Sequence, residues 1–271
     1  MNQFLPTSHN VQRLTDEEKT QYRSRGYVRN LPVFDDDEVI LLQHRFEQLL
    51  ALLPEGTDIN KINCWHKANR WVSNLCRTPA ILDYAEDVLG PDFFQWGCQF
   101  FCKLPGVSSE VPWHQDAHYW PLMPQETTTV WLAFYDTDAS NGAMKVVAGS
   151  HDAGMWAHSG VSGEQFVLAQ SVDPNQIDEA DVVTIGLKAG EMSLHDDRLV
   201  HGSGPSESGQ RRVGLTMRFS PTRVRCDLSV WPTFESYLVR GKDRYRHNPE
   251  GTIPSGDGAP SGMFQPSSNF A

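Results

Sequence analysis

The stretch Thr127-Thr128-Thr129-Val130-Trp131-Leu132-Ala133-Phe134-Tyr135 is β-branched and aromatic, and it predicts a buried strand. Segments of the same kind lie on both sides of it, separated by Gly, Asn, Asp and Pro. They run from Phe93 to Lys103, Met144 to Ala148, Val182 to Leu187, Glu191 to His195 and Arg212 to Ser220. Many short strands at such spacing predict a sandwich or a jelly-roll barrel.

The first part of the chain predicts helices instead. Thr15-Asp16-Glu17-Glu18 is a capping box ahead of a short polar helix that ends near Gly26. The acidic run Asp35–Glu38 precedes the apolar segment Val39–Leu50, and carboxylates there suit the positive end of a helix dipole. A third helix is predicted from Pro79 to Gly90, with proline in its first turn and glycine at its end.

Helices followed by strands predict one domain that spans residues 1–271, in which helices buttress one sheet. We expect the helical part to span about residues 1–90, the jelly-roll core about residues 91–225 and a C-terminal tail about residues 226–271. No internal repeat divides the chain further.

The end of this tail, from His247 to Ala271, is rich in Gly, Pro and Ser. This composition predicts either a disordered segment or a flap laid down on the protein. Phe264 and Phe270 would give such a flap apolar side chains to bury.

The formal net charge is −11, from 23 Lys and Arg against 34 Asp and Glu. Nucleic acid and anionic membrane surfaces are therefore not expected as partners, since both attract clustered positive charge. No apolar run approaches the roughly 20 residues of a membrane span, and the first residues lack the features of a signal peptide. The five cysteines are odd in number and form no CxxC motif, so reduced, buried thiols and a cytoplasmic location are expected.

Trp113-His114-Gln115-Asp116 offers an imidazole and a carboxylate two residues apart. In an extended segment both side chains leave the same face, so His114 and Asp116 could bind one metal ion. His201 is the natural third ligand, but His195 is a rival, and a site built from His195 and the two aspartates after it is also open. Two histidines and one carboxylate form the facial triad of non-heme Fe(II) oxygenases.

Arg212 is the first residue of a segment in which polar and apolar residues alternate, as in a strand. Ser203 lies earlier in the chain, two residues after His201. A guanidinium anchored there could present its planar fork to a carboxylate, with the serine hydroxyl as a further donor. A metal site with an arginine nearby suits a 2-oxo acid, whose keto-acid end would chelate iron while its distal carboxylate pairs with the arginine. The alternative is an ordinary surface arginine on a barrel strand.

Three motifs follow one another in order. They are Trp113-His114-Gln115-Asp116-Ala117-His118-Tyr119-Trp120-Pro121, Gly142-Ala143-Met144-Lys145-Val146-Val147-Ala148-Gly149-Ser150-His151, and His201-Gly202-Ser203-Gly204-Pro205 with Arg212. Together they resemble the phytanoyl-CoA dioxygenase family of Fe(II)- and 2-oxoglutarate-dependent oxygenases, from about Thr15 to about Thr222. The resemblance implies a mainly β fold with flanking helices, in which N-terminal helices buttress a double-stranded β-helix (jelly-roll, cupin-like) core.

The resemblance also implies a role for each matched residue. It assigns iron to His114, Asp116 and His201, and not to His195. It implies that Arg212 binds the distal carboxylate of 2-oxoglutarate. The further cosubstrate contacts that it implies are made by Ser203, Trp131, Gln99 and Lys61.

Asp116 indicates the reaction type, because halogenating relatives lack this carboxylate. The resemblance therefore implies hydroxylation of an unactivated C–H, with O2 consumed, succinate and CO2 released, and ascorbate as the reductant in vitro. Alternatives are a non-oxidative metalloenzyme, a hydrolase or isomerase that uses the same residues, and a binding module with a vestigial metal site.

His118, Tyr119 and Trp120 follow the ligand pair and are expected to line the mouth of the site, and Arg70 could line the same pocket. A mixed aromatic and cationic pocket predicts a small polar metabolite, such as an amino acid, a quaternary amine or an aminophosphonate. An acyl-CoA substrate is the alternative. No obligate protein partner is evident from the sequence.

Overall fold

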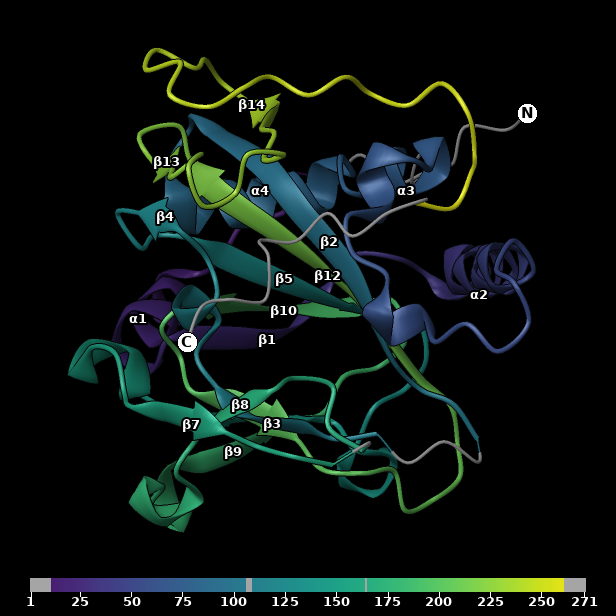
Figure 1. Cartoon of the computed structure of the whole chain (residues 1–271), viewed down its shortest axis with the longest axis vertical. Coiled ribbons are helices and arrows are strands. Elements are labelled where there is room, and N and C mark those ends of the chain that lie inside the picture. The colour runs from purple at the N-terminus through teal and green to yellow at the C-terminus, as the bar shows by residue number, and fades with distance from the viewer. Residues whose placement is uncertain (1–10, 106–108, 164, 261–271) are drawn as a thin grey trace.

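The computed structural model describes residues 11–105, 109–163 and 165–260. Two antiparallel sheets form its core (Figure 1). In the described residues the major sheet has the strand order β1-β10-β5-β12-β2-β14, and the minor sheet has the order β3-β11-β6-β9. Two further pairs, β4 with β13 and β7 with β8, lie beside them. The predicted fold class, mainly β with a jelly-roll core and flanking helices, is confirmed.

The strands of the major sheet include the longest predicted segments at nearly the predicted bounds. They are β1 (Tyr27–Pro32), β2 (Phe93–Lys103), β5 (Thr128–Ala133), β10 (Glu191–Asp196), β12 (Arg212–Pro221) and β14 (Tyr237–Arg240). The minor sheet contains β3 (Val111–His114), β6 (Met144–Val147), β9 (Val182–Ile185) and β11 (His201–Ser203). The short strands are β4 (Leu122–Met123), β7 (His158–Gly160), β8 (Gln170–Val172) and β13 (Arg225–Cys226).

The helices begin and end with the capping residues that the sequence predicts. Thr15 and Asp35 each form a complete capping box, ahead of α1 (Asp16–Arg25) and α2 (Asp36–Leu50). Gly26 ends α1 in the left-handed conformation that glycine adopts without strain. The remaining helices are α3 (Arg70–Leu75), α4 (Pro79–Leu89) and the 3-10 turns η1 (Ile59–Lys61), η2 (Trp65–Lys67), η3 (Asp116–His118), η4 (Ala139–Asn141), η5 (Ser150–Ala153), η6 (Pro174–Gln176) and η7 (Glu179–Asp181).

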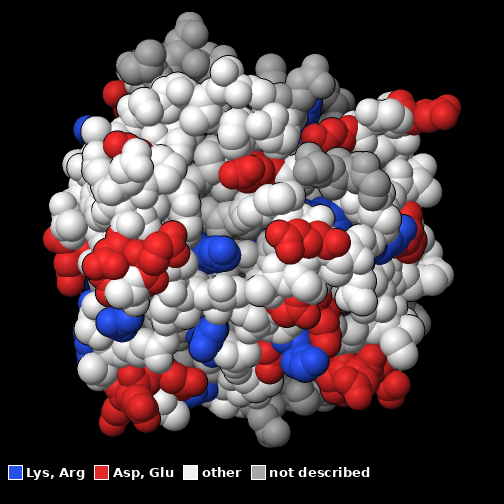
Figure 2. Space-filling view, turned by 90° about the horizontal axis from the view of Figure 1, so that it is seen from below, with Lys and Arg blue, Asp and Glu red and all other residues white. Residues whose placement is uncertain are grey.

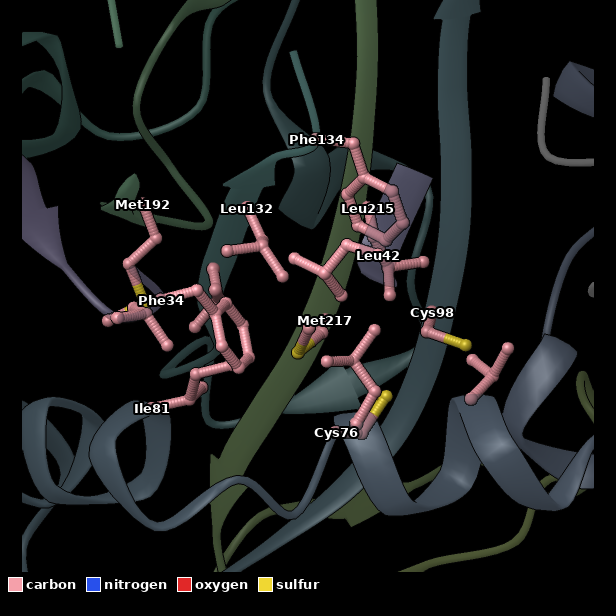
Figure 3. Packing of buried hydrophobic residues seen from close by; sticks show 14 of the residues in the cluster. Phe34, Leu42, Cys76, Ile81, Cys98, Leu132, Phe134, Met192, Leu215 and Met217 are labelled. Carbon is pink, nitrogen blue, oxygen red and sulfur yellow. The ribbon is translucent and has the colours of Figure 1, made fainter. Parts of the chain in front are cut away.

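The main hydrophobic core lies between the helices and the outer face of the major sheet. Leu42 of α2, Ile81 of α4 and Leu132 of β5 belong to this one cluster (Figure 3). Because side chains alternate along a strand, Trp131 leaves the opposite face of β5 and joins a second cluster inside the barrel. Burial on both faces explains why β5 has no polar alternation in its sequence.

Two strands of the major sheet were not predicted, and both lie at its edges. β1 falls in the part of the chain that was predicted to be helical, and β14 falls in the predicted tail. In β1, Asn30 has a positive φ of 59° and the register with β10 shifts between Val28 and Leu31. This irregular edge strand breaks the alternation that would reveal a strand in the sequence.

Residues 247–260 form no helix or strand, but they are laid down on the protein. The backbone N–H of Arg70 donates to the carbonyl of Gly256 at 2.8 Å, and the N–H of Trp71 donates to a carboxylate oxygen of Asp257 at 3.1 Å. Phe264 and Phe270, the apolar residues proposed for a flap, lie outside the described residues.

The surface and the thiols agree with the composition. On the face shown in Figure 2, acidic side chains gather in several clusters and basic side chains are scattered between them. All five cysteines are free and buried, as expected. In the part of the chain that the structure describes, no helix has the length and apolarity that a membrane crossing needs.

The packing of α2 provides a test with an internal control. Leu42 is fully buried, whereas the adjacent Leu41 is 52% exposed. We expect Leu42→Ala to lower the free energy of unfolding by about 2–5 kcal/mol, because it leaves a cavity in the core. Leu41→Ala should change it by less than about 0.5 kcal/mol. Urea unfolding monitored by circular dichroism measures both, and equal effects would contradict this packing.

Candidate metal centre

The register of the minor sheet places two histidines directly opposite each other. His201, the first residue of β11, pairs with His114, the last residue of β3. Their ring centroids lie 4.1 Å apart. Directly paired residues of an antiparallel ladder have side chains on the same face, so this pairing brings together two residues that are far apart in the sequence.

Each of these rings is oriented by a backbone carbonyl two residues earlier. Nδ1 of His114 lies 2.9 Å from the oxygen of Pro112, and Nδ1 of His201 lies 2.9 Å from the oxygen of Leu199. Carbonyl oxygens can only accept, so Nδ1 carries the proton in both rings. Nε2 of each imidazole is then left with a free lone pair, as a metal ligand requires.

The third member of the cluster is Asp116, which begins η3 after the extended residue Gln115. One ligand atom from each of His114, Asp116 and His201 lies within 4.8 Å of the others, and all three residues are buried. Oδ1 of Asp116 is 3.6 Å from Nε2 of His114. Oδ2 accepts a hydrogen bond of 3.0 Å from the hydroxyl of Thr129 on β5. The carboxylate is therefore oriented with Oδ1 toward the histidines.

His195, the rival candidate, lies beside this cluster. Its Nε2 is 3.7 Å from Oδ2 of Asp116, and its ring centroid is 4.6 Å from that of His201. Within the described residues neither of its ring nitrogens has a hydrogen-bond partner. Its place is thus behind the carboxylate of Asp116, on the oxygen that Thr129 already holds.

Protonation in the cluster suits cation binding. Burial, together with the nearby His114 and His195, lowers the pKa of His201 well below its ordinary value, so the ring is neutral. Burial raises the pKa of the Asp116 carboxyl, but the nearby rings of His114 and His195, 3.6 Å and 3.7 Å from its oxygens, outweigh burial and hold this pKa well below its usual range. Two imidazoles and one carboxylate are the donor set of a facial triad.

A cationic group lines the same cavity on the inner face of β12. Arg212 is 2% exposed, and its guanidinium carbon lies 4.7 Å from the centroid of the Trp131 ring. Gly214 makes this possible, because a Cβ at that position would lie 1.9 Å from the Trp131 ring. Nε of Arg212 and the hydroxyl of Ser203, which also lines the cavity, are buried without a partner among the described residues.

Lys103, a buried lysine, lies next to Arg212. It is the register partner of Arg212 on β2, and its Nζ donates to the carbonyl of Ser109 at 2.6 Å. Burial and the charge of Arg212 lower the pKa of Lys103 to about 7. Burial lowers the pKa of Arg212 to about 10, so the guanidinium stays charged at neutral pH. Neither has an ion pair with a carboxylate of the described residues, so this end of the cavity attracts an anion.

The remaining predicted cosubstrate residues lie at different distances from the cavity. Gln99 is buried on β2, where Thr216 of the cavity wall donates to its backbone carbonyl at 3.0 Å. Lys61 is exposed at the end of η1, and Arg70 is exposed at the start of α3. Neither Lys61 nor Arg70 lines the cavity, so the structure gives their predicted contacts no support.

The residues predicted for the mouth, His118, Tyr119 and Trp120, are not among the described residues that line the cavity, although the Tyr119 ring lies 5.9 Å from that of His114. His118 stacks on His158 with ring centroids 3.9 Å apart, and Tyr119 donates from its hydroxyl to the carbonyl of Gln170 at 3.1 Å. Trp120 is half-buried, and its ring meets that of Trp96 edge-on at 4.6 Å.

Gln115 is a positioning residue that the sequence reasoning missed. Its fully buried amide donates to the carbonyls of Gly154 at 2.9 Å and Arg198 at 2.6 Å, and it accepts from the N–H of Trp156 at 2.7 Å. Lys103 was not predicted as a site residue either. A lysine at the end of the predicted buried strand Phe93 to Lys103 could have indicated that it lies near the site.

The residues present fit Fe(II) and a 2-oxo acid. The cluster of two imidazoles and one carboxylate suits Fe(II), and it lies in one cavity with Arg212 and Ser203. The unpartnered donors of those two residues suit a carboxylate.

Comparison with known proteins agrees with this chemistry. Residues 22–214 match the phytanoyl-CoA dioxygenase (PhyH) family. The peroxisomal phytanoyl-CoA dioxygenase of Mus musculus is 25% identical over 84% of this chain and 74% of its own length. The probable alpha-ketoglutarate-dependent hypophosphite dioxygenase of Stutzerimonas stutzeri is 25% identical over 83% of this chain and 86% of its own. The solved structure of the apo non-heme monooxygenase ThoJ superposes with a TM-score of 0.73 at 26% identity, covering 88% of this chain and 89% of that one.

The chain therefore belongs to the phytanoyl-CoA dioxygenase family. It is an Fe(II)- and 2-oxoglutarate-dependent dioxygenase.

Metal titration distinguishes the two histidine candidates. We expect His201→Ala to abolish stoichiometric Fe(II) binding, because it removes a ring whose Nε2 faces the cluster. His195→Ala should keep one Fe(II) per chain and lose about 10–100-fold in affinity, as outer-sphere substitutions do. Anaerobic titration calorimetry measures both. Loss of binding in His195→Ala with full binding in His201→Ala would reverse the assignment.

Proposed function

We propose that this protein hydroxylates an unactivated C–H of a small polar metabolite, with iron held by His114, Asp116 and His201. The observation that carries the proposal is one cavity that contains both this cluster and the buried Arg212, which forms no ion pair with the residues that the structure describes. The metal and 2-oxoglutarate, when bound, supply the oxidising chemistry with O2 and leave succinate and CO2 as coproducts.

The protein's part at the metal is to hold three donors in fixed orientation. The carbonyls of Pro112 and Leu199 accept hydrogen bonds from Nδ1 of His114 and His201, respectively. The proton of each ring therefore stays on Nδ1, and Nε2 can bind the metal. The Thr129 hydroxyl occupies Oδ2 of Asp116, which leaves Oδ1 as the metal-binding oxygen. Presence of this carboxylate supports hydroxylation, since halogenating members of such families lack it.

At the other end of the cavity we assign the distal carboxylate of 2-oxoglutarate to Arg212. Trp131 lies against the guanidinium and limits its movement, and the Ser203 hydroxyl is a second donor. Lys103 is the register partner of Arg212, and we assign to it the cosubstrate contact that the family resemblance gave to Lys61. Gln99 is retained as a proposed contact from β2.

The size and lining of the cavity support a small substrate. Even with the open solvent at its mouth, the empty volume of the cavity is only about 370 Å³. The names of the relatives span a small oxyanion, hypophosphite, and an acyl thioester, phytanoyl-CoA. We favour an amino acid, a quaternary amine or an aminophosphonate, with His118, Tyr119 and Trp120 at the mouth.

We further propose that the chain acts as one cytoplasmic domain on a small molecule. Strands from both its N-terminal and C-terminal parts complete the major sheet, which supports one folding unit. Five free thiols suit a reducing compartment.

The proposed reaction predicts that the protein converts 2-oxoglutarate to succinate. With Fe(II), ascorbate and a panel of amino acids, quaternary amines, aminophosphonates and acyl-CoA thioesters, we expect succinate release that a small polar compound stimulates. Mass spectrometry should then find that compound heavier by one oxygen. If no compound of the panel leads to succinate release, and the protein with a metal other than iron hydrolyses or isomerises one of them, a non-oxidative metalloenzyme would be favoured.

The two neighbouring arginines provide a matched pair for the cosubstrate site. Arg212→Ala should raise the half-saturating concentration of 2-oxoglutarate by an amount equivalent to about 2–5 kcal/mol, because it removes a buried charged contact. Arg211 is exposed and forms an ion pair with Glu47, so Arg211→Ala should leave this concentration unchanged. Succinate release against 2-oxoglutarate concentration measures both. The reverse result would assign the carboxylate to Arg211.

A further inference from the structure

Arg218 is a second buried arginine on the inner face of β12. It lines the same cavity as the metal cluster and is 5% exposed. Its position is even-numbered like that of Arg212, so both side chains leave the same face of the strand. Six residues of strand separate them by roughly 20 Å along β12. The backbone of Arg218 is therefore far from Arg212, which lies at the end of the cavity that we assign to the cosubstrate carboxylate.

The register of the sheet places Arg218 at the level of the metal cluster. On one side its partner is Thr129 of β5, the residue that donates to Asp116. On the other side its partner is Gly97 of β2. A Cβ at position 97 would lie 3.1 Å from Cδ of Arg218, so glycine leaves room for the arginine stem.

A β-bulge next to this pair positions an aromatic ring against the guanidinium. The register between β12 and β2 shifts after Arg218, from Gly97 to Gln95, so Trp96 has no partner on β12. Bulges re-aim side chains beside functional sites. The guanidinium carbon of Arg218 lies 5.8 Å from the centroid of the Trp96 ring and 5.0 Å from that of Trp120.

The hydrogen-bonding capacity of Arg218 is largely unused. Nη1 is 3.4 Å from Oδ1 of Asn63, which is a long contact, and Nε has no partner within the described ranges of the chain. Among the described residues no carboxylate forms an ion pair with it. A buried guanidinium has five N–H donors, and this one makes a single long hydrogen bond. Because a buried charge without partners is unfavourable, Arg218 is suited to bind an anionic ligand.

We propose that Arg218, with its guanidinium held against the rings of Trp96 and Trp120, binds an anionic group of the substrate, a carboxylate or a phosphonate, from the cavity. This inference rests on the proposed function, because it concerns the substrate of that reaction. It narrows the substrate class to acids: an amino acid or an aminophosphonate fits, and a quaternary amine fits only when it also carries an acid. The anionic group anchors the substrate so that a nearby C–H faces the metal.

The test compares each acid with its neutral partner, a derivative whose acid group is masked as an uncharged amide or ester while its amine is kept. L-Proline is paired with L-prolinamide, and 2-aminoethylphosphonate is paired with its diethyl ester, so that the two pairs distinguish carboxylate from phosphonate. Acetate and methylphosphonate serve as minimal anions. Each compound is titrated against the protein loaded with Fe(II) and saturating 2-oxoglutarate without oxygen, and binding is followed by tryptophan fluorescence, since two tryptophans flank Arg218.

We expect at least one acid to bind the wild-type protein about tenfold or more tightly than its neutral partner. Arg218→Gln should remove this preference, and Arg218→Lys, which keeps the charge without the planar fork, should retain part of it. Arg211→Gln is the surface control, and thermal unfolding checks the fold of each variant. If Arg218→Gln does not fold, the partial loss in Arg218→Lys carries the test.

Equal binding of acids and neutral partners, or no binding of any anion, would overturn the proposal. So would an equal loss for both members of a pair in Arg218→Gln, which would mean that the arginine only balances the charge of Asp116. Failure of the proposed function has a different signature. In that case the wild-type protein would not convert 2-oxoglutarate to succinate under oxygen, whatever its preference for anions.

Discussion

The antiparallel pairing of β3 with β11 is the constraint on which the site depends. It places His201 opposite His114, although 86 residues separate them in the sequence. β11 is also paired with β6 on its other side, so its register is held twice. A slip by one residue would turn the ring of His201 to the other face of the sheet, and Asp116 would then have only one histidine beside it.

The two faces of the major sheet divide stability from chemistry. Its outer face is apolar and packs on the helices, and this burial stabilises the fold. The stabilisation offsets the cost of burying charged side chains inside the barrel. Its inner face presents Arg212 and Arg218 from β12 with a tryptophan against each guanidinium. Glycines at 214 and 97 make room for these contacts, so small residues on the inner face are as necessary as the cations.

How much the sequence predicted depends on how local each feature is. The capping boxes of α1 and α2 and the strands β2 and β12 depend on neighbouring residues, and they were predicted at nearly the observed bounds. The edge strands β1 and β14 were missed, because pairing with a distant strand and not a local pattern makes them extended. Strand pairing also brings Lys103 beside Arg212, whereas Lys61, the predicted contact, is exposed at the end of η1.

By itself the sequence determined the fold class, the family and the three residues of the candidate metal cluster. Composition, the alternation of apolar residues and short motifs indicate these features, and each of these signals depends on residues that are close in the sequence. Only the tertiary structure decided how these residues meet. It placed His195 behind Asp116, tied Gln115 to distant carbonyls and left Arg218 buried without an ion pair to any described residue. These relations arise from strand register and from a bulge, which join residues far apart in the chain and leave no signal in any short stretch of it.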